Sequence, residues 1–162
     1  MLSSNVFALF APPTGGLWVG YFFGGFSFLS NGRVTNYGGL TASSSGTVYT
    51  LAEDSKGTMW PGTGSGVWRF EGSKWEHLGA EWGIPTTIRT VGIDRTDTVW
   101  AINGFSNNQM LLYLLPGSKR FQLAIPKLDV YGFTLYRNDS HSNAREKKDP
   151  AGSGDGPGRA RY

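Results

Sequence analysis

The sequence predicts an all-β fold: an incomplete β-propeller of about three four-stranded antiparallel blades, followed by a disordered C-terminal tail. Three tryptophans, Trp18, Trp60 and Trp100, recur at spacings of 42 and 40 residues. This matches the ~40 to 45 residues of a propeller blade. An apolar residue stands twelve positions before each tryptophan, and glycine-rich turns separate short apolar runs. No segment combines the apolar periodicity of an α-helix with helix-capping residues, and glycine at 24 of 162 positions disfavours helices.

The first repeat, predicted to cover about residues 4–38, begins at Val6 and keeps its turn glycine, Gly15. Its turn reads Pro-Pro-Thr-Gly and lacks an aspartate. Beyond the tryptophan, residues 25–36 align with residues 66–77 of the second repeat, in apolar pattern and in turn position. The repeat therefore includes the later strands of each unit.

The second repeat, about residues 46–79, shows the four strands of a blade most clearly. Asp54 favours turn initiation and Gly57 accepts a positive φ, so the segment between them is a tight turn. Further turns are expected over residues 62–66 and 71–73. The predicted strands are about Val48–Glu53, Thr58–Pro61, Val67–Phe70 and Lys74–Leu78.

The third repeat, about residues 86–124, aligns Asp94 with Asp54 but has Asp97 where the turn glycine stands. It also has Ile102 in place of the glycine two positions after the tryptophan, and a longer loop before its third strand. Residues 126–136 are predicted to start a further strand or a linker. Residues 137–162 contain almost nothing apolar to bury and are predicted to be disordered.

A large aromatic residue at one fixed position per blade is best explained as filling the space between adjacent sheets. Burying one indole removes ~150 to 250 Å² from water, which contributes at most roughly 4 to 6 kcal/mol. We therefore interpret Trp18, Trp60 and Trp100 as structural, together with the turn residues Asp54, Gly57 and Asp94.

The segment from Leu51 to Phe70, Leu-Ala-Glu-Asp-Ser-Lys-Gly-Thr-Met-Trp-Pro-Gly-Thr-Gly-Ser-Gly-Val-Trp-Arg-Phe, resembles the two-component regulator propeller repeat. The resemblance covers about Val6 to Leu123. It implies a sensory role, as in the extracytoplasmic input domains of bacterial sensor histidine kinases, and a periplasmic location. No apolar run reaches the ~18 to 20 residues that cross a bilayer, and the first residues show no secretory signal.

Three blades do not close a ring, since propellers usually need ~4 to 8. We expect a fragment of a longer propeller whose open blade faces favour self-association. The alternative is a free-standing interaction or carbohydrate-binding module in which two three-bladed chains complete a six-bladed ring.

Catalytic, metal and cofactor sites are not expected. Cysteine is absent, the two histidines lie far apart, and the two aspartates of the third repeat lack the spacing of a calcium loop. The segment Gly62–Gly66 lacks the lysine and helix of a phosphate loop. Six of the fifteen basic residues lie beyond residue 136, which leaves nine basic and eight acidic residues in the body. The body therefore lacks the basic stripe of a nucleic-acid-binding protein.

A ligand site, if present, is expected where blade connectors and the turns between second and third strands meet near the central channel. Tyr21 and Trp82 could stack on a sugar or another planar group. Asn107, Asn108 and Gln109 could hydrogen-bond its hydroxyls. The ordinary alternative for each is a loop residue without a ligand, and the ligand itself, a small molecule or a glycan, is not identified by the sequence.

Overall fold

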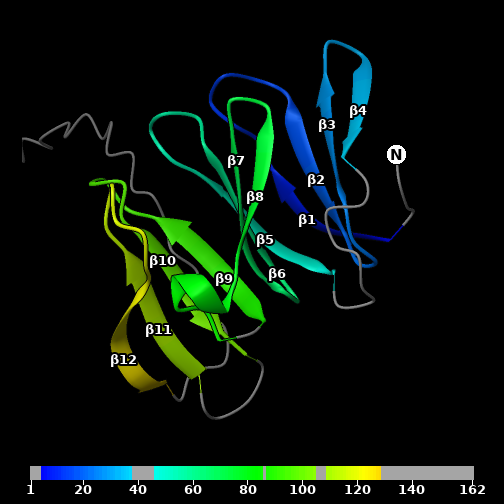
Figure 1. Ribbon diagram of the computed structural model, residues 1–162. Coiled ribbons are helices and arrows are strands. Elements are labelled where there is room, and N and C mark those ends of the chain that lie inside the picture. The colour runs from blue at the N-terminus through cyan, green and yellow to red at the C-terminus, as the bar shows by residue number, and fades with distance from the viewer. Residues whose placement is uncertain (1–4, 38–45, 86, 105–108, 129–162) are drawn as a thin grey trace, which may run out of the picture.

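The computed structural model describes residues 5–37, 46–85, 87–104 and 109–128, which form three four-stranded antiparallel sheets (Figure 1). The first sheet contains β1 (Val6–Phe10), β2 (Leu17–Tyr21), β3 (Phe26–Ser30) and β4 (Arg33–Tyr37). The second contains β5 (Val48–Glu53), β6 (Met59–Thr63), β7 (Gly66–Glu71) and β8 (Lys74–Leu78). The third contains β9 (Ile88–Ile93), β10 (Val99–Asn103), β11 (Gln109–Leu114) and β12 (Gln122–Leu128).

Within each sheet the strands follow one another in chain order, joined by antiparallel hairpins. The first strands, β1, β5 and β9, lie next to one another, so the three sheets pack face to face as successive blades (Figure 1). The predicted all-β propeller architecture of three blades is confirmed. One short 3-10 helix, Ala80–Trp82, interrupts the connector between the second and third sheets.

Strand boundaries in the second sheet differ slightly from the prediction. The first and fourth strands match, whereas β6 and β7 extend into the glycine run that was expected to be a turn. Gly62 lies in β6, where the next sheet approaches closely. A Cβ at this position would stand 3.0 Å from Val91 Cγ2 and 3.1 Å from the Ile88 carbonyl oxygen of that sheet, which explains why the residue is glycine. Gly20 has the same role, since its Cβ would lie 2.5 Å from Val48 Cγ1. In the third sheet, β12 continues to Leu128, past the expected boundary of the blade.

The turn between the first two strands is built in the same way in all three sheets. The amides of Gly15, Gly57 and Asp97 each donate to the carbonyl three residues earlier, at 3.0, 3.1 and 3.1 Å. All three residues have positive φ, 94°, 81° and 60° respectively. Asp97 therefore adopts the left-handed conformation of the glycine that it replaces, and the alignment of the repeats holds.

Two hydrophobic clusters fill the spaces between neighbouring sheets. Trp18 belongs to the cluster between the first and second sheets and is 7% exposed. Trp60 belongs to the cluster between the second and third sheets and is 6% exposed. Trp100 is half-buried, because within the described part of the chain no further sheet covers that face of the third one. The wedge role predicted for the tryptophans therefore holds for two of the three.

The turn aspartates also fix the indole rings, a role that the sequence did not reveal. In the second sheet, Asp54 Oδ1 accepts from the amides of Lys56 and Thr58, and its Oδ2 accepts from Trp60 Nε1 at 3.0 Å. The third sheet repeats the arrangement, with Trp100 Nε1 donating to Asp94 Oδ2 at 2.9 Å. One carboxylate thus joins the turn to the tryptophan six residues later. In the first sheet, the equivalent position is Pro12, which has no carboxylate.

Candidate functional site

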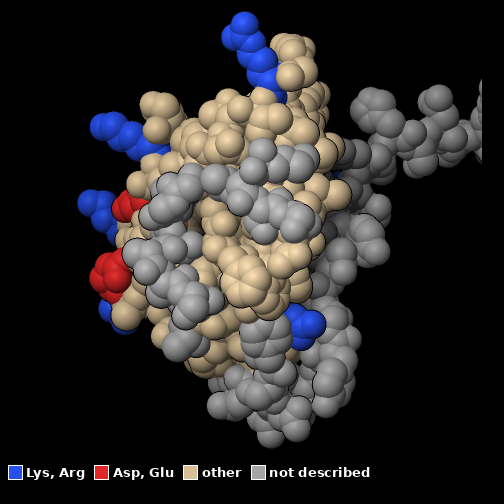
Figure 2. All heavy atoms as spheres, turned by 90° about the vertical axis from the view of Figure 1, so that its right-hand side faces the viewer, with Lys and Arg blue, Asp and Glu red and all other residues tan. Residues whose placement is uncertain are grey.

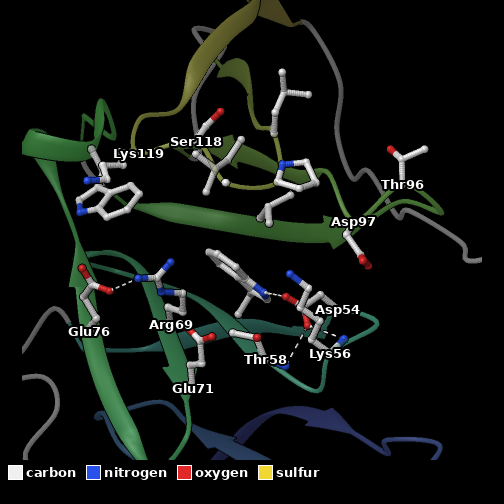
Figure 3. A pocket seen from close by; sticks show the side chains of 17 residues that line it. Asp54, Lys56, Thr58, Arg69, Glu71, Glu76, Thr96, Asp97, Ser118 and Lys119 are labelled. Carbon is white, nitrogen blue, oxygen red and sulfur yellow. Dashed lines mark hydrogen bonds and ion pairs between the residues drawn. The ribbon is translucent and has the colours of Figure 1, made fainter.

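A cleft of about 590 Å³ opens between the second and third sheets (Figure 3). Its walls are the β5–β6 and β9–β10 turns, the outer strands β7 and β8, the loop after β11, and Trp82 of the connector. Trp60 and Trp82 supply aromatic surface, and Val99, Leu114 and Leu115 supply aliphatic surface. A volume of this size lies within the ~300 to 1,000 Å³ typical of small-molecule sites.

At this junction three ring-bearing positions of the repeat carry smaller or linear side chains, and two of these side chains, Arg69 and Leu114, line the cleft. Between the first and second sheets, the Trp18 ring lies 4.7 Å from Phe28, 5.5 Å from Tyr37 and 5.7 Å from Phe70, centroid to centroid. Strand pairing places Arg69, Leu78 and Leu114 at the equivalent positions around Trp60. These three rings are therefore absent from the second junction, where Phe121 and Trp82 supply other aromatic surface.

Arg69 lies at the centre of the cleft wall (Figure 3). Its guanidinium carbon is 5.8 Å from the centroid of Trp60 and 5.5 Å from that of Trp82, so the cation contacts two aromatic rings. The same guanidinium forms an ion pair with Glu76 on the adjacent strand β8, where the two side chains are 27% and 45% exposed. Partial exposure weakens the ion pair but leaves the ring contacts in place.

Two of the carboxylates in the cleft are bound to other parts of the protein. Asp54 accepts the three hydrogen bonds of its turn. Asp97 accepts from the amide of Ser55 at 2.9 Å and also from the Ser55 hydroxyl, which connects the β9–β10 turn to the β5–β6 turn of the preceding sheet. Exposed charges remain at Lys56, Glu71 and Lys119, toward the mouth of the cleft.

Two carboxyl groups near the cleft have lowered pKa values. Partial burial raises the pKa of Asp94, but hydrogen bonds from the Trp100 indole, the Thr96 hydroxyl and two backbone amides outweigh it and lower the pKa to about 2. The pKa of Glu81 is lowered mainly by the backbone amide of Gly79, which donates to it at 3.0 Å. Both groups are therefore ionised at neutral pH.

The structure places the predicted ligand residues in different environments. Trp82 lines the cleft and packs against the core of the second junction. Tyr21 is fully buried, and its hydroxyl donates to Ser27 Oγ at 2.9 Å, which in turn donates to Asn36 Oδ1 at 2.7 Å. The expectation that Tyr21 stacks on a ligand is therefore wrong, because the ring packs inside the first sheet. Gln109 is 7% exposed and donates to the Gly104 carbonyl at 3.4 Å, while Asn107 and Asn108 lie outside the described residues.

The cleft is also located differently from the expected site. Among the described residues of the loops expected to gather at the channel, only Trp82, in the connector after β8, lines the cleft. Sequence reasoning missed Arg69 and Glu76. A signal was present, since Arg69 aligns with Phe28 and carries a charge on the strand face that is apolar in the first repeat.

Among the residues described, no group of three or more His, Cys, Asp or Glu side chains is arranged to hold a metal ion. In the same part of the chain, no helix has the length and apolar character needed to span a bilayer.

No family model matches the sequence, and no curated protein matches it. Among solved structures, the chain is similar to the extracellular domain of a protein described as a hybrid two-component system, BT3049 from B. thetaiotaomicron, with a TM-score of 0.63 and 24% identity. The extracellular domain of BT4673 from the same organism gives a TM-score of 0.61 and 17% identity. Virginiamycin B lyase from Staphylococcus aureus gives 0.61 and 13%.

These matches cover 77%, 78% and 76% of this chain, but 17%, 17% and 42% of the respective structures. The chain therefore spans less than half the length of each of these three proteins. At such identities the likeness shows a shared propeller-like fold.

Proposed function

We propose that this chain is part of a non-catalytic sensory β-propeller, which binds a small molecule or a glycan and serves as the extracytoplasmic input domain of a two-component signalling protein. The observation that carries the proposal is the cleft between the second and third sheets, with Arg69 between Trp60 and Trp82. The fold likeness to extracellular domains of proteins described as two-component systems supports the sensory part.

The position of the cleft suits a sensor because its walls belong to two different sheets. A ligand held there touches β7 and β8 on one side and the loop after β11 on the other. Such a ligand favours the relative arrangement of the two sheets in which it makes the most contacts. Binding would therefore be converted into a small change in sheet packing, which neighbouring structure could transmit.

The proposal is tested by titrating the purified chain with a panel of neutral oligosaccharides (maltohexaose, cellohexaose and xylohexaose) and aromatic fragments such as indole. We expect at least one compound to raise the melting temperature, since a ligand of the folded state stabilises it by RT ln(1 + [L]/Kd). Each compound should be recovered chemically unchanged after incubation, as judged by mass spectrometry. If no member of the panel binds, or if one is turned over, the proposal fails.

A second candidate function, an interaction module that closes its ring by self-association, is favoured by the outer face of the first sheet, which neither of the other two described sheets covers. In the second and third sheets, one set of repeat positions faces the preceding sheet. In the first sheet the same positions carry apolar side chains, of which Leu9 and Val34 are 62% and 44% exposed. The set consists of Leu9, Leu17, Leu29 and Val34. In Figure 2, seen from the side of the first sheet, the described residues are mainly uncharged, and most of the charged side chains, both basic and acidic, lie toward the margins. Light scattering over a range of concentrations tests this candidate: a discrete dimer that Leu9→Lys dissociates supports it, and a monomer throughout excludes it.

A further inference from the structure

We infer that the cleft between the second and third sheets binds a planar aromatic small molecule. The ligand ring would occupy the space that aromatic side chains of the protein fill at the junction between the first and second sheets. The inference rests on the proposed function, because it names the ligand class of the same cleft. It is drawn from a comparison between two junctions of one molecule, which differ in a few side chains at equivalent positions.

The junction between the first and second sheets shows what fits around the repeated tryptophan. The Trp18 ring meets Phe70 at 5.7 Å and 69°, and Trp75 at 6.2 Å and 88°, both edge to face. Phe28 lies 4.7 Å from the same indole on its own sheet. Offset and edge-to-face contacts at these distances are the favoured geometries of aromatic pairs. The first junction therefore contains a set of aromatic rings around its tryptophan.

At the second junction the tryptophan is retained and two of these rings are replaced. Arg69 stands at the position of Phe28, and Leu114 stands at the position of Phe70. The space that the rings would fill belongs to the cleft, where Leu114 and Arg69 form part of the wall. A ligand ring entering from solvent would restore the packing that the first junction obtains from Phe70.

The polar groups of the cleft are compatible with a flat, uncharged ring. The guanidinium of Arg69 is planar and contacts both Trp60 and Trp82, so a ligand ring placed beside either indole lies next to a cation that already packs on aromatic rings. The carboxylates of Asp54, Glu76 and Asp97 are bound within the protein. Recognition therefore depends mainly on ring shape, and the exposed side chains at the mouth can contact polar substituents on the ring.

Indole is the probe, and the experiment is a titration of the full chain followed by two-dimensional NMR of the tryptophan Nε1–H groups. Single Trp→Phe variants assign the resonances. We expect saturable shifts for Trp60 and Trp82 and none for Trp18 and Trp100, with a dissociation constant in the millimolar range or below. Cyclohexanol, of similar size but not planar, should bind at least tenfold more weakly.

Leu114→Phe supplies the missing ring from the protein itself. We expect it to raise the melting temperature and to weaken indole binding at least tenfold. Leu29→Phe is the matched control, since Leu29 holds the same repeat position on the first sheet, away from the cleft, and should leave indole binding unchanged. Arg69→Phe, which copies the first repeat at the other position, is the second filling variant if Leu114→Phe does not fold.

The results test the ligand class and the proposed function separately. Indole that fails to bind, binds no better than cyclohexanol, or binds equally to the filled variants overturns the aromatic assignment. If an oligosaccharide binds while indole does not, and Leu114→Phe blocks the oligosaccharide, the proposed function stands and the ligand class is wrong. If neither binds, the proposed function fails as well.

Discussion

The indole of Trp60 donates a hydrogen bond to the carboxylate of Asp54 over 3.0 Å, and the same bond recurs between Trp100 and Asp94 at 2.9 Å. The carboxylate also accepts from two amides of its own turn in each case. The tight turn and the large aromatic residue of the repeat are thus held by one acidic side chain. This explains why the aspartate and the tryptophan occur six residues apart in both repeats.

Replacing Asp54 with alanine should destabilise the protein. The substitution leaves two turn amides and a largely buried indole N–H without their acceptor, which costs about 1–3 kcal/mol. Urea unfolding followed by tryptophan fluorescence measures the change. Glu71→Ala, an exposed carboxylate on the same sheet, is the control and should stay within about 0.5 kcal/mol of the wild type. Equal losses for the two variants would contradict the role of Asp54.

The contribution of Asp94 should depend on pH in a defined direction. Its pKa is lowered from 3.8 to about 2 in the folded protein, so its stabilising contribution is complete above 3.8 and disappears as the pH falls through about 2. The difference in unfolding free energy between wild type and Asp94→Asn should be constant from pH 7 to about pH 5 and shrink below pH 4. A difference that grows on acidification would refute this assignment.

Gly20→Ala should destabilise the packing of the first sheet on the second. The added Cβ would stand 2.5 Å from Val48 Cγ1, closer than side-chain atoms can approach. Overpacking of this kind costs about 1–3 kcal/mol. Adding Val48→Ala removes the closer of the two Val48 atoms that would clash, Cγ1, and leaves the Cβ at 2.8 Å. The double mutant should therefore lose less stability than the two single mutants together, as measured by a double-mutant cycle. Strict additivity would show that the two residues are not in contact.

Arg69 should contribute more to stability through its contacts with the indole rings of Trp60 and Trp82 than through its ion pair with Glu76. Glu76→Gln removes only a partly exposed charge partner, which costs about 0–1 kcal/mol. Arg69→Ala also removes the contacts with Trp60 and Trp82, which adds about 0.5–2 kcal/mol. Thermal unfolding at low and high salt separates the two effects, because only the ion pair is strongly screened. A salt-sensitive loss of stability of the same size in both variants would contradict this prediction, because the ring contacts would then add nothing to the ion pair.

The sequence alone predicts the blades because the repeat marks the same chemistry at regular positions. The tryptophan, the turn aspartate and the apolar start of each first strand identify the second and third sheets, including the full length of β5. The limits of β6 were missed, since glycines that look like a turn lie in a strand where the next sheet approaches closely.

The candidate site was harder to predict, because it depends on which side chains are missing from a junction. The sequence aligns Arg69 with Phe28, but only the packing of two sheets shows that this position borders a cleft. The prediction for Tyr21 failed because its hydrogen-bond partner is not evident in the sequence. A tyrosine beside a glycine-rich turn resembles a loop residue, but the hydroxyl of Tyr21 has a buried partner in Ser27. Trp82 lies in the connector where the sequence placed it and lines the cleft, and its contact with a ligand stays a prediction.

Gly20 and Gly62 let the second strand of each of the first two sheets approach the sheet that follows it, but the third sheet has Ile102 at that position, 4% exposed. A branched side chain therefore stands where the first two sheets have only a hydrogen atom. The close approach of strand to sheet that glycine permits at the two described junctions is thus not repeated at this position of the third sheet.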